Sequence, residues 1–282
     1  MTSRTPVALA MLCIAALCGF ATNALLCRRA LGSYAIDAAS FTAIRLVSGA
    51  AVLALLARGA ARGAGSWASG AALFAYAATF SFAYLRLTTA TGALILFGLV
   101  QVTMIGSGVA RGERPRAREW LGIAVAVGGL VALTLPGLAA PDPLGAALMA
   151  IAGISWGVYS LRGHGAINPL AVTADNFARS LPLAGLLVIV VGAADGAVVI
   201  SPAGALLAVV SGAVASGLGY SLWYAVLPQL TATRAAILQL SVPVLAAGGG
   251  ALLLAEPVTL RFAVCSAATL GGVALAVISR RR

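Results

Sequence analysis

The segment AYLRLTTATGALIL, residues 83–96, decides the fold, because a second version of it stands at residues 225–238 as AVLPQLTATRAAIL. Eight positions are identical at a constant offset of 142 residues. Low-complexity sequence rich in Ala, Gly and Leu explains matched threonines at fixed spacing poorly. We therefore interpret the two segments as equivalent points of an internal repeat.

The repeat continues C-terminal to these segments. At an offset of 143 residues, Glu113, Arg118, Gly128 and Gly129 correspond to Glu256, Arg261, Gly271 and Gly272. The pattern predicts two repeats, residues 1–138 and 139–282, with five apolar spans each. An odd number of spans makes the second repeat enter the membrane with opposite topology. Inverted repeats of this kind are typical of secondary transporters, whose substrate sites lie between the two halves.

The composition favours a protein that lies almost wholly in a membrane. Hydrophobic residues make up 61% of the 282 residues and charged residues 9%, whereas soluble domains carry about 25% charged residues. A spanning helix needs about 20 apolar residues, and the first apolar run is too long for a signal peptide. The expected class is an all-α polytopic membrane protein with about ten transmembrane helices. The predicted spans are 7–27, 38–57, 66–86, 89–110, 118–136, 143–162, 169–192, 202–226, 231–254 and 259–279.

The positive charge consists of arginine alone: the 18 basic residues include no lysine. That absence excludes the lysine of an ATP-binding P-loop and a lysine Schiff base, so no ATPase function is implied. The arginines are dispersed between apolar runs, which is unlike a nucleic-acid-binding surface. With the ten predicted spans, twelve arginines lie on the same side of the membrane as the N-terminus, four lie on the opposite side and two lie within spans. The positive-inside rule then predicts a multi-pass protein of a bacterial inner membrane with both termini cytoplasmic.

Metal and cofactor chemistry is not expected. The chain has four cysteines, no C-x-x-C motif and a single histidine, His164, whereas a metal site needs a cluster of such ligands. We interpret the cysteines as free thiols that pack like small apolar groups. The motif H-E-x-x-H is absent, and the only histidine falls in a predicted loop, so an enzyme is not expected.

The sequence resembles the drug/metabolite transporter superfamily, EamA type, over nearly its whole length. The matching features are Arg45 and Arg179 in the second span of each half, the Thr-containing segments 89–96 and 231–238, Glu113 and Glu256, the glycine pairs, and Ser155-Trp156-Gly157. Two departures are Cys18-Gly19, where the family often has Trp-Gly, and Gln101, where the second half has the expected Pro243. Length and pattern are also similar to the YddG-type aromatic amino-acid exporters. The resemblance implies export of amino acids, aromatic ones included.

Aromatic residues gather in the third and eighth spans, and the sixth span adds a further pair. They form three groups on helix faces, namely Tyr76, Phe80 and Tyr84; Tyr220, Trp223 and Tyr224; and Trp156 with Tyr159. One interpretation is the wall of an apolar cavity whose hydroxyls orient a solute. The other is an aromatic belt at the lipid headgroups, or helix packing. On the first interpretation these residues bind the substrate together with Phe20, Asn23, Gln101 and Gln239.

Ionisable residues inside spans are few and are candidates for gating or coupling. Asp175 and Arg179 have the i, i+4 spacing that pairs side chains on one helix face, which suits a structural ion pair as well as a coupling group. Arg45 has no such neighbour. It either pairs across helices, snorkels, lines a vestibule or meets a substrate carboxylate. Pro182 and Pro243 interrupt their predicted spans and are candidate hinges or static kinks.

The leading hypothesis is a secondary transporter that exports small neutral or zwitterionic metabolites, above all amino acids, because the spans carry few charges. The expected partners are a small-molecule substrate and the lipid bilayer. Alternatives are broader drug or metabolite efflux, passive facilitation and lipid scrambling. Proton coupling and facilitated diffusion both stay open.

Overall fold

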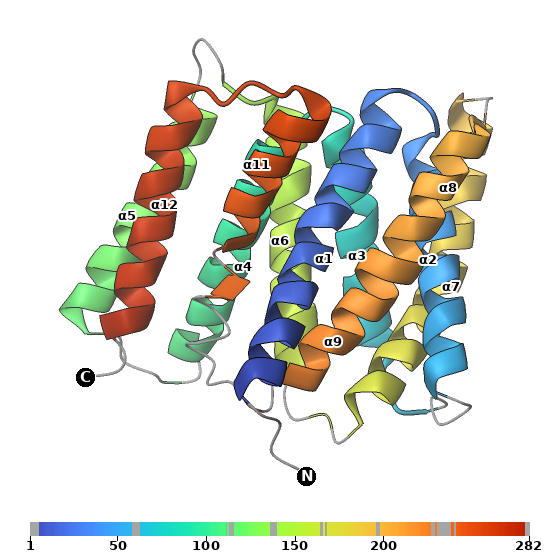
Figure 1. The fold of residues 1–282 in the computed structure, drawn as a ribbon, viewed down its shortest axis with the longest axis horizontal. Helices are drawn as coiled ribbons and strands as arrows, with labels where there is room; N and C mark the ends of the chain where they lie inside the picture. The colour runs from blue at the N-terminus through green and yellow to red at the C-terminus, as the bar shows by residue number, and fades with distance from the viewer. Residues whose placement is uncertain are drawn as a thin grey trace.

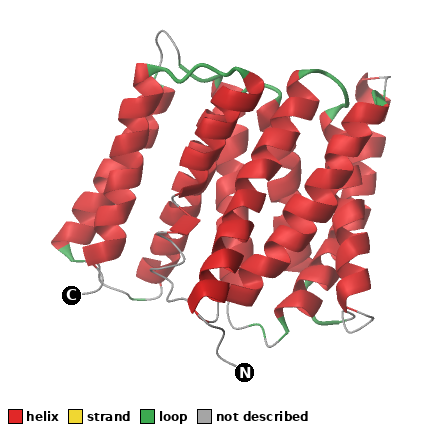
Figure 2. Cartoon of the chain, in the orientation of Figure 1, coloured by secondary structure: helices red, strands yellow, loops and turns green. Residues whose placement is uncertain are grey.

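The computed structural model describes residues 6–57, 63–110, 112, 116–135, 140–163, 166, 168–195, 198–226, 229, 238–239 and 241–279. Within these ranges the chain is built of helices and loops, without a strand (Figure 2). An isolated antiparallel bridge joins Ile36 to Ile200 in the loops that precede α2 and α8. The predicted all-α class is confirmed.

The helices follow the predicted spans closely. They are α1 (Pro6–Gly32), α2 (Ala38–Ala57), α3 (Trp67–Tyr84), α4 (Thr89–Ala110), α5 (Ala117–Thr134), α6 (Pro143–Gly163), α7 (Pro169–Asp195), α8 (Pro202–Val210), η1 (Ser211–Leu218), α9 (Gly219–Val226), α11 (Ser241–Leu254) and α12 (Leu260–Ser279). Six stretches of the described chain are long and apolar enough to cross a bilayer, and α11 and α12 are shorter apolar helices.

The helices stand side by side as an up-and-down bundle (Figure 1). The start of α1 and the end of α12 lie at the same end of the bundle, which we call the terminal end; the opposite end is the far end. We call α1–α5 the first half of the chain and α6–α12 the second half. Helix α1 packs against α9 and α11, and α4 packs against α6 and α11, so the two halves are interleaved.

Several helices begin at a side chain that caps the free N–H groups of the first turn. Proline at the first helical position of α6, α7 and α8 is suited to a site where no N–H is needed. At the start of α2, α3, α6, α7 and α8, a side-chain oxygen accepts a hydrogen bond from the backbone N–H three residues further along the chain. The capping residues are Asp37, Ser66, Asp142, Asn168 and Ser201. These short local patterns explain why the predicted starts of the helices were close.

The structure corrects the end of the first span and confirms a turn after the third. Helix α1 continues to Gly32, beyond the predicted end at residue 27, so Arg28 and Arg29 belong to the helix and not to a loop. The chain does turn at Arg86, as a bilayer's thickness requires. There the N–H groups of Arg86 and Leu87 donate to the carbonyl of Ala83.

The eighth span is one continuous helical rod in which the central eight residues, Ser211–Leu218, form a π-helix between α8 and α9. The sequence predicted the extent of this span but not the change of winding. Gly212 lies on the face toward α2, where an added Cβ would overlap the carbonyl oxygen of Arg45 and the hydroxyl of Ser48. The two helix backbones are therefore in direct contact beside Arg45.

Helices α5 and α12 pack along their whole length and stand apart from the rest, joined to it chiefly through α4 (Figure 1). Their contact runs through glycines. A Cβ on Gly122 would lie 2.6 Å from the carbonyl oxygen of Gly272, and a Cβ on Gly272 would lie 2.6 Å from that of Gly122. Small residues allow this close approach, which is how helices associate in lipid without a hydrophobic driving force.

Candidate functional site

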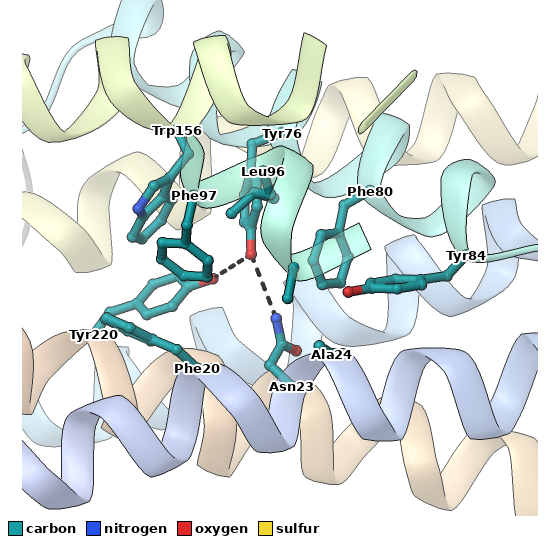
Figure 3. Close-up of a pocket in the computed structure, with 11 residues that line it drawn as sticks. Phe20, Asn23, Ala24, Tyr76, Phe80, Tyr84, Leu96, Phe97, Trp156 and Tyr220 are labelled. Atoms are coloured by element: carbon teal, nitrogen blue, oxygen red, sulfur yellow. Dashed lines mark hydrogen bonds between the residues drawn. The ribbon is translucent and has the colours of Figure 1, made fainter. Parts of the chain in front are cut away.

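A pocket lies inside the bundle and is built by both halves of the chain (Figure 3). Its walls come from α1, α3, α4, α6 and α9, and its lining residues are Phe20, Asn23, Ala24, Tyr76, Phe80, Tyr84, Ala93, Leu96, Phe97, Trp156 and Tyr220. About 340 Å³ of the pocket is not occupied by protein atoms. This space is narrow, so the centre of a water molecule fits within only about 20 Å³ of it. That volume holds about one water molecule, so an amino acid fits only if the lining side chains move apart.

Aromatic rings form most of the pocket wall. The ring centre of Trp156 lies 4.7 Å from that of Tyr220, 4.9 Å from that of Tyr76 and 6.1 Å from that of Phe20. Phe20 in turn lies 6.4 Å from Phe97. Tilted and edge-to-face arrangements at these separations are the ones that aromatic pairs favour. The wall therefore offers an apolar solute both ring faces and ring edges.

The polar groups of the pocket converge on the hydroxyl of Tyr76 (Figure 3). The Tyr220 hydroxyl donates to it over 3.2 Å, and Nδ2 of Asn23 donates to it over 3.4 Å. Asn23 itself accepts a hydrogen bond of 2.6 Å from Ser211 of η1. This hydroxyl–amide cluster joins α1 and α3 to the eighth span.

Directly behind the cluster stands Arg45 of α2, whose side chain is 1% exposed. Its Nη2 donates to the hydroxyls of Tyr76 and Tyr220, and its Nε donates to Ser216, each over 3.1 Å. The guanidinium carbon lies 5.2 Å from the ring centre of Tyr76 and 5.0 Å from that of Phe80, within cation–π range. The guanidinium thus sits in the interior, bound across helices, and does not reach the membrane surface.

The π-helix explains how the eighth span forms hydrogen bonds with both α1 and α2. In an α-helix, residues five apart point about 140° away from each other, because each residue turns by about 100°. The i→i+5 bonds of a π-helix bring such residues toward one face. Ser211 accordingly reaches Asn23 on α1, and Ser216 reaches Arg45 on α2. π-helical turns recur at functional sites.

Seven of the predicted substrate-binding residues line this pocket: Phe20, Asn23, Tyr76, Phe80, Tyr84, Trp156 and Tyr220. Sequence reasoning missed the other lining residues, Ala24, Ala93, Leu96 and Phe97, because such residue types are common in any membrane span. It also missed Ser211 and Ser216, which differ in no visible way from other serines in apolar runs.

The remaining predicted substrate-binding residues lie outside the lining of the pocket. Three aromatic rings form a second row behind it. Trp223 packs on Phe20 at 5.7 Å, Tyr159 on Trp156 at 5.5 Å, and Tyr224 on Tyr159 at 6.4 Å. Gln101 and Gln239 are buried but are not part of the pocket lining. These five residues do not border the space that a solute would occupy in this conformation.

Asp175 and Arg179 form the ion pair that their spacing predicts, with 3.0 Å between Oδ2 and Nε. The same carboxylate oxygen accepts the backbone N–H of Gly65 at 2.8 Å, and Oδ1 of Asn176 accepts that of Ser66 at 3.0 Å. These contacts anchor the start of α3 to α7 at the terminal end. The pair therefore lies away from the pocket, in surroundings unlike those of Arg45.

The two prolines occupy different positions in their helices. Pro182 lies inside α7, as predicted. Pro243 is the third residue of α11 as described, and residues 238 and 239 ahead of it are also helical. The expectation that Pro243 interrupts its span stays a prediction, because residues 230–237 and 240 lie outside the described residues.

At the far end, an ion pair that sequence reasoning did not single out joins the two halves. Nε of Arg28 lies 3.1 Å from Oε1 of Glu256, and the other carboxylate oxygen accepts the backbone N–H of Thr89 at 2.8 Å. Nη1 of Arg28 donates to the carbonyl of Tyr84 at 2.9 Å. We call these four residues the far-end latch. It was missed because Arg28 was assigned to a loop, and Glu256 was noted only for the repeat and the family resemblance.

The backbone before Glu256 adopts an unusual conformation. Ala255 has φ 53°, and the N–H of Glu256 donates to the carbonyl of Gly250, six residues earlier. This is the left-handed helix end that glycine usually forms, and an alanine there costs about 1–2 kcal/mol. This conformation places Glu256 next to Arg28 and Thr89.

The described residues contain no group of three or more His, Cys, Asp or Glu side chains close enough to hold a metal ion. Cys13, Cys18, Cys27 and Cys265 are all free thiols. His164 lies outside the described residues.

Comparison with known proteins gives a consistent picture. Residues 143–278 match the model of the EamA-like transporter family. A Pseudomonas aeruginosa protein described as uncharacterized is 51% identical over 96% of this chain and 94% of its own length. An Archaeoglobus fulgidus protein described as an uncharacterized transporter is 28% identical over 63% of each chain. A solved crystal structure with 20% sequence identity superimposes with a TM-score of 0.67 over 99% of this chain and 100% of its own, which shows a shared fold.

Proposed function

Because residues 143–278 match the EamA-like transporter family, we propose that the chain belongs to it and moves small amphipathic metabolites by alternating access through the pocket between its two halves. A multi-pass membrane transporter of small molecules is what the family supports. The observation that carries the proposal is the pocket itself. Its aromatic wall comes from both halves of the chain, and its hydroxyl–amide cluster is backed by a buried arginine.

Amino acids, aromatic ones included, are the proposed substrates, and export across a bacterial inner membrane with cytoplasmic termini is the proposed direction. The aromatic lining suits an apolar side chain, and the few polar groups suit orientation of a small head group. The proposed architecture is two inverted repeats, residues 1–138 and 139–282. Substrate sites of such transporters lie at the repeat interface, where rocking of one repeat against the other opens them in turn.

The far-end latch supports alternating access, because it bridges the halves above the pocket. Arg28 and Tyr84 belong to the first half and Glu256 to the second. The latch is partly buried, with the Glu256 side chain 10% exposed. A pocket that opens toward the far end needs these contacts to separate, so the latch is the proposed closure on that side.

Glu256→Gln is expected to raise the labelling rate of Cys27 by an impermeant maleimide applied at the far end by roughly tenfold. Hydrogen bonds to charged groups contribute about 1.5–3 kcal/mol, and the variant loses the charge that holds Arg28. Cys27 is fully buried beside Arg28 and serves as a native reporter. The measurement uses a protein whose other cysteines are replaced by alanine.

Arg86→Gln is the matched control, because it breaks a second ion pair at the same end, Arg86–Asp142, that is largely exposed. We expect no change in Cys27 labelling there, since exposed pairs contribute about 0–1 kcal/mol. Equal labelling of the wild type and Glu256→Gln would remove the latch from the mechanism.

Asp175→Asn is expected to leave the dependence of transport on a pH gradient unchanged and to lower the melting temperature by a few degrees. Asp175 is engaged by Arg179 and by the backbone of Gly65, away from the pocket, which favours a structural role. Transport into proteoliposomes with and without an imposed pH gradient checks this. A variant that still transports but no longer responds to the gradient would assign the coupling role to Asp175 instead.

The proposed function is tested by counterflow. Proteoliposomes loaded with unlabelled amino acids are given labelled phenylalanine, tryptophan, leucine or alanine with no ion gradient. Exchange above that of protein-free liposomes, strongest for the aromatic amino acids, is the expected result. Exchange of other metabolites or drugs but of no amino acid would overturn the substrate assignment. Fluorescent-lipid flipping without solute exchange would favour a scramblase.

A further inference from the structure

Arg45 is a buried cation for which the described residues provide no anion. The ion pairs among these residues are Arg28–Glu256, Arg86–Asp142 and Arg179–Asp175, and Arg45 takes part in none of them. A charge taken out of water costs several kcal/mol unless it is paired, and ionisable groups inside a membrane protein mark functional sites. Cation–π contacts with Tyr76 and Phe80 offset part of this cost only.

The groups around Arg45 are also unbalanced between donors and acceptors. A guanidinium carries five N–H donors and accepts nothing. Its Nε and Nη2 are bound to hydroxyl oxygens, while Nη1 is buried without a partner among the described residues. The Tyr76 oxygen accepts from Arg45, from Asn23 and from Tyr220. With so many donors directed at neutral oxygens, the cluster lacks a strong acceptor.

The open space next to this cluster is the pocket. Tyr76, Phe80 and Tyr220 each contact the guanidinium on one side and line the pocket on the other. Figure 3 shows the two tyrosine hydroxyls meeting at its centre. An acceptor placed there can take hydrogen bonds from both phenols, and from Nη1 once the tyrosines shift.

We infer that Arg45, together with Tyr76 and Tyr220, recognises a carboxylate, so that the substrates are monocarboxylates with an aromatic or apolar body. This inference rests on the proposed transport function and narrows its substrate class. A carboxylate supplies both the missing charge and the missing acceptor, and it matches the fork of a guanidinium. Among the described residues that line the pocket, none is a carboxylate that would bind an ammonium group. The amino group of an amino acid is therefore tolerated but not required.

Three probes with the same phenyl body test the inference by thermal shift of the purified protein: L-phenylalanine, 3-phenylpropionate and 2-phenylethylamine. A ligand that binds the folded protein raises its melting temperature in proportion to the logarithm of its concentration over Kd. We expect both carboxylates to stabilise the protein, and the amine, which lacks a carboxylate, to leave the midpoint unchanged. Stabilisation by the amine equal to that by 3-phenylpropionate would overturn the inference.

Variants locate the recognition. Arg45→Gln is expected to weaken 3-phenylpropionate binding at least tenfold, whereas Arg86→Gln, which changes an exposed arginine at the far end, leaves it as in the wild type. If Arg45→Gln does not fold, Arg45→Lys keeps the charge without the fork and is expected to weaken binding several-fold. Tyr76→Phe, which removes one bridging hydroxyl, is expected to do the same. Unchanged carboxylate affinity in all folded variants would overturn the assignment.

The failure of this inference can be told apart from the failure of the proposed function. Counterflow of amines or neutral solutes, with no preference for carboxylates, would refute carboxylate recognition and leave a transporter. Absence of counterflow for every solute in a broad metabolite panel would refute transport itself, and carboxylate recognition with it.

Discussion

Gly212→Ala is expected to destabilise the protein by about 3 kcal/mol, near the upper part of the usual cost of overpacking a core. The added methyl group would overlap the carbonyl oxygen of Arg45 and the hydroxyl of Ser48. Neither atom is the end of a long, flexible side chain, so α2 and the π-helix must separate. Because the hydrogen bond from Arg45 to Ser216 spans this contact, the site loosens together with the fold. The measurement is the temperature at which half the protein stays monodisperse in detergent.

Gly185→Ala is the matched control for this change. Gly185 lies in α7, and a Cβ there would meet nothing within 4 Å. Alanine is favoured over glycine inside a helix by roughly 0.5–1 kcal/mol, so this variant is expected to be neutral or slightly more stable. The diagnostic result is a loss of stability for Gly212→Ala together with unchanged or higher stability for Gly185→Ala. Equal stability of both proteins would mean that α2 and η1 do not touch as described.

Trp156→Ala is expected to abolish amino-acid counterflow and to lower the free energy of unfolding by about 3–5 kcal/mol, the usual cost of truncating a buried tryptophan. The ring is 4% exposed and lies between Phe20, Tyr76 and Tyr220. Its removal leaves a cavity in the pocket wall and frees the neighbouring rings to collapse into the pocket. Counterflow and thermal stability of the same reconstituted sample check both effects.

Two further variants separate function from stability. Trp156→Phe keeps an aromatic face and is expected to recover part of both properties. Trp120→Ala, on an exposed side of α5 where the residue is 52% exposed, is expected to change stability by less than about 0.5 kcal/mol. If Trp156→Ala exchanged amino acids at the wild-type rate, the pocket would not be the substrate path.

The prediction of the helices succeeded because their determinants are local. A run of about 20 apolar residues satisfies its own backbone only as a helix in lipid. Short patterns such as Asp142-Pro143 and Ser201-Pro202 then set where a helix starts. The end of α1 was misplaced at residue 27, because arginine near a helix end is normally an interface anchor. Arg28 instead finds Glu256, which lies 228 residues away in the chain.

The aromatic part of the site could also be anticipated, since large rings at i, i+4 spacing are visible in one dimension. Whether those rings face lipid or one another could not be decided, because both cases have the same spacing. Trp156 and Tyr220 meet in the pocket, while Trp223 stands behind Phe20. That difference depends on how each helix is rotated about its axis in the bundle. Contacts with residues of several other helices set this rotation.

By itself, the sequence determined the all-α class of the protein, because composition and span length need no knowledge of packing. The tertiary structure alone decided what each arginine does. Arg45 and Arg179 have similar positions in the sequence, yet one is enclosed by hydroxyls and rings and the other is paired with Asp175. The physical reason is that the environment of a charge comes from neighbouring helices. A span that winds partly as a π-helix supplies neighbours that no local pattern predicts.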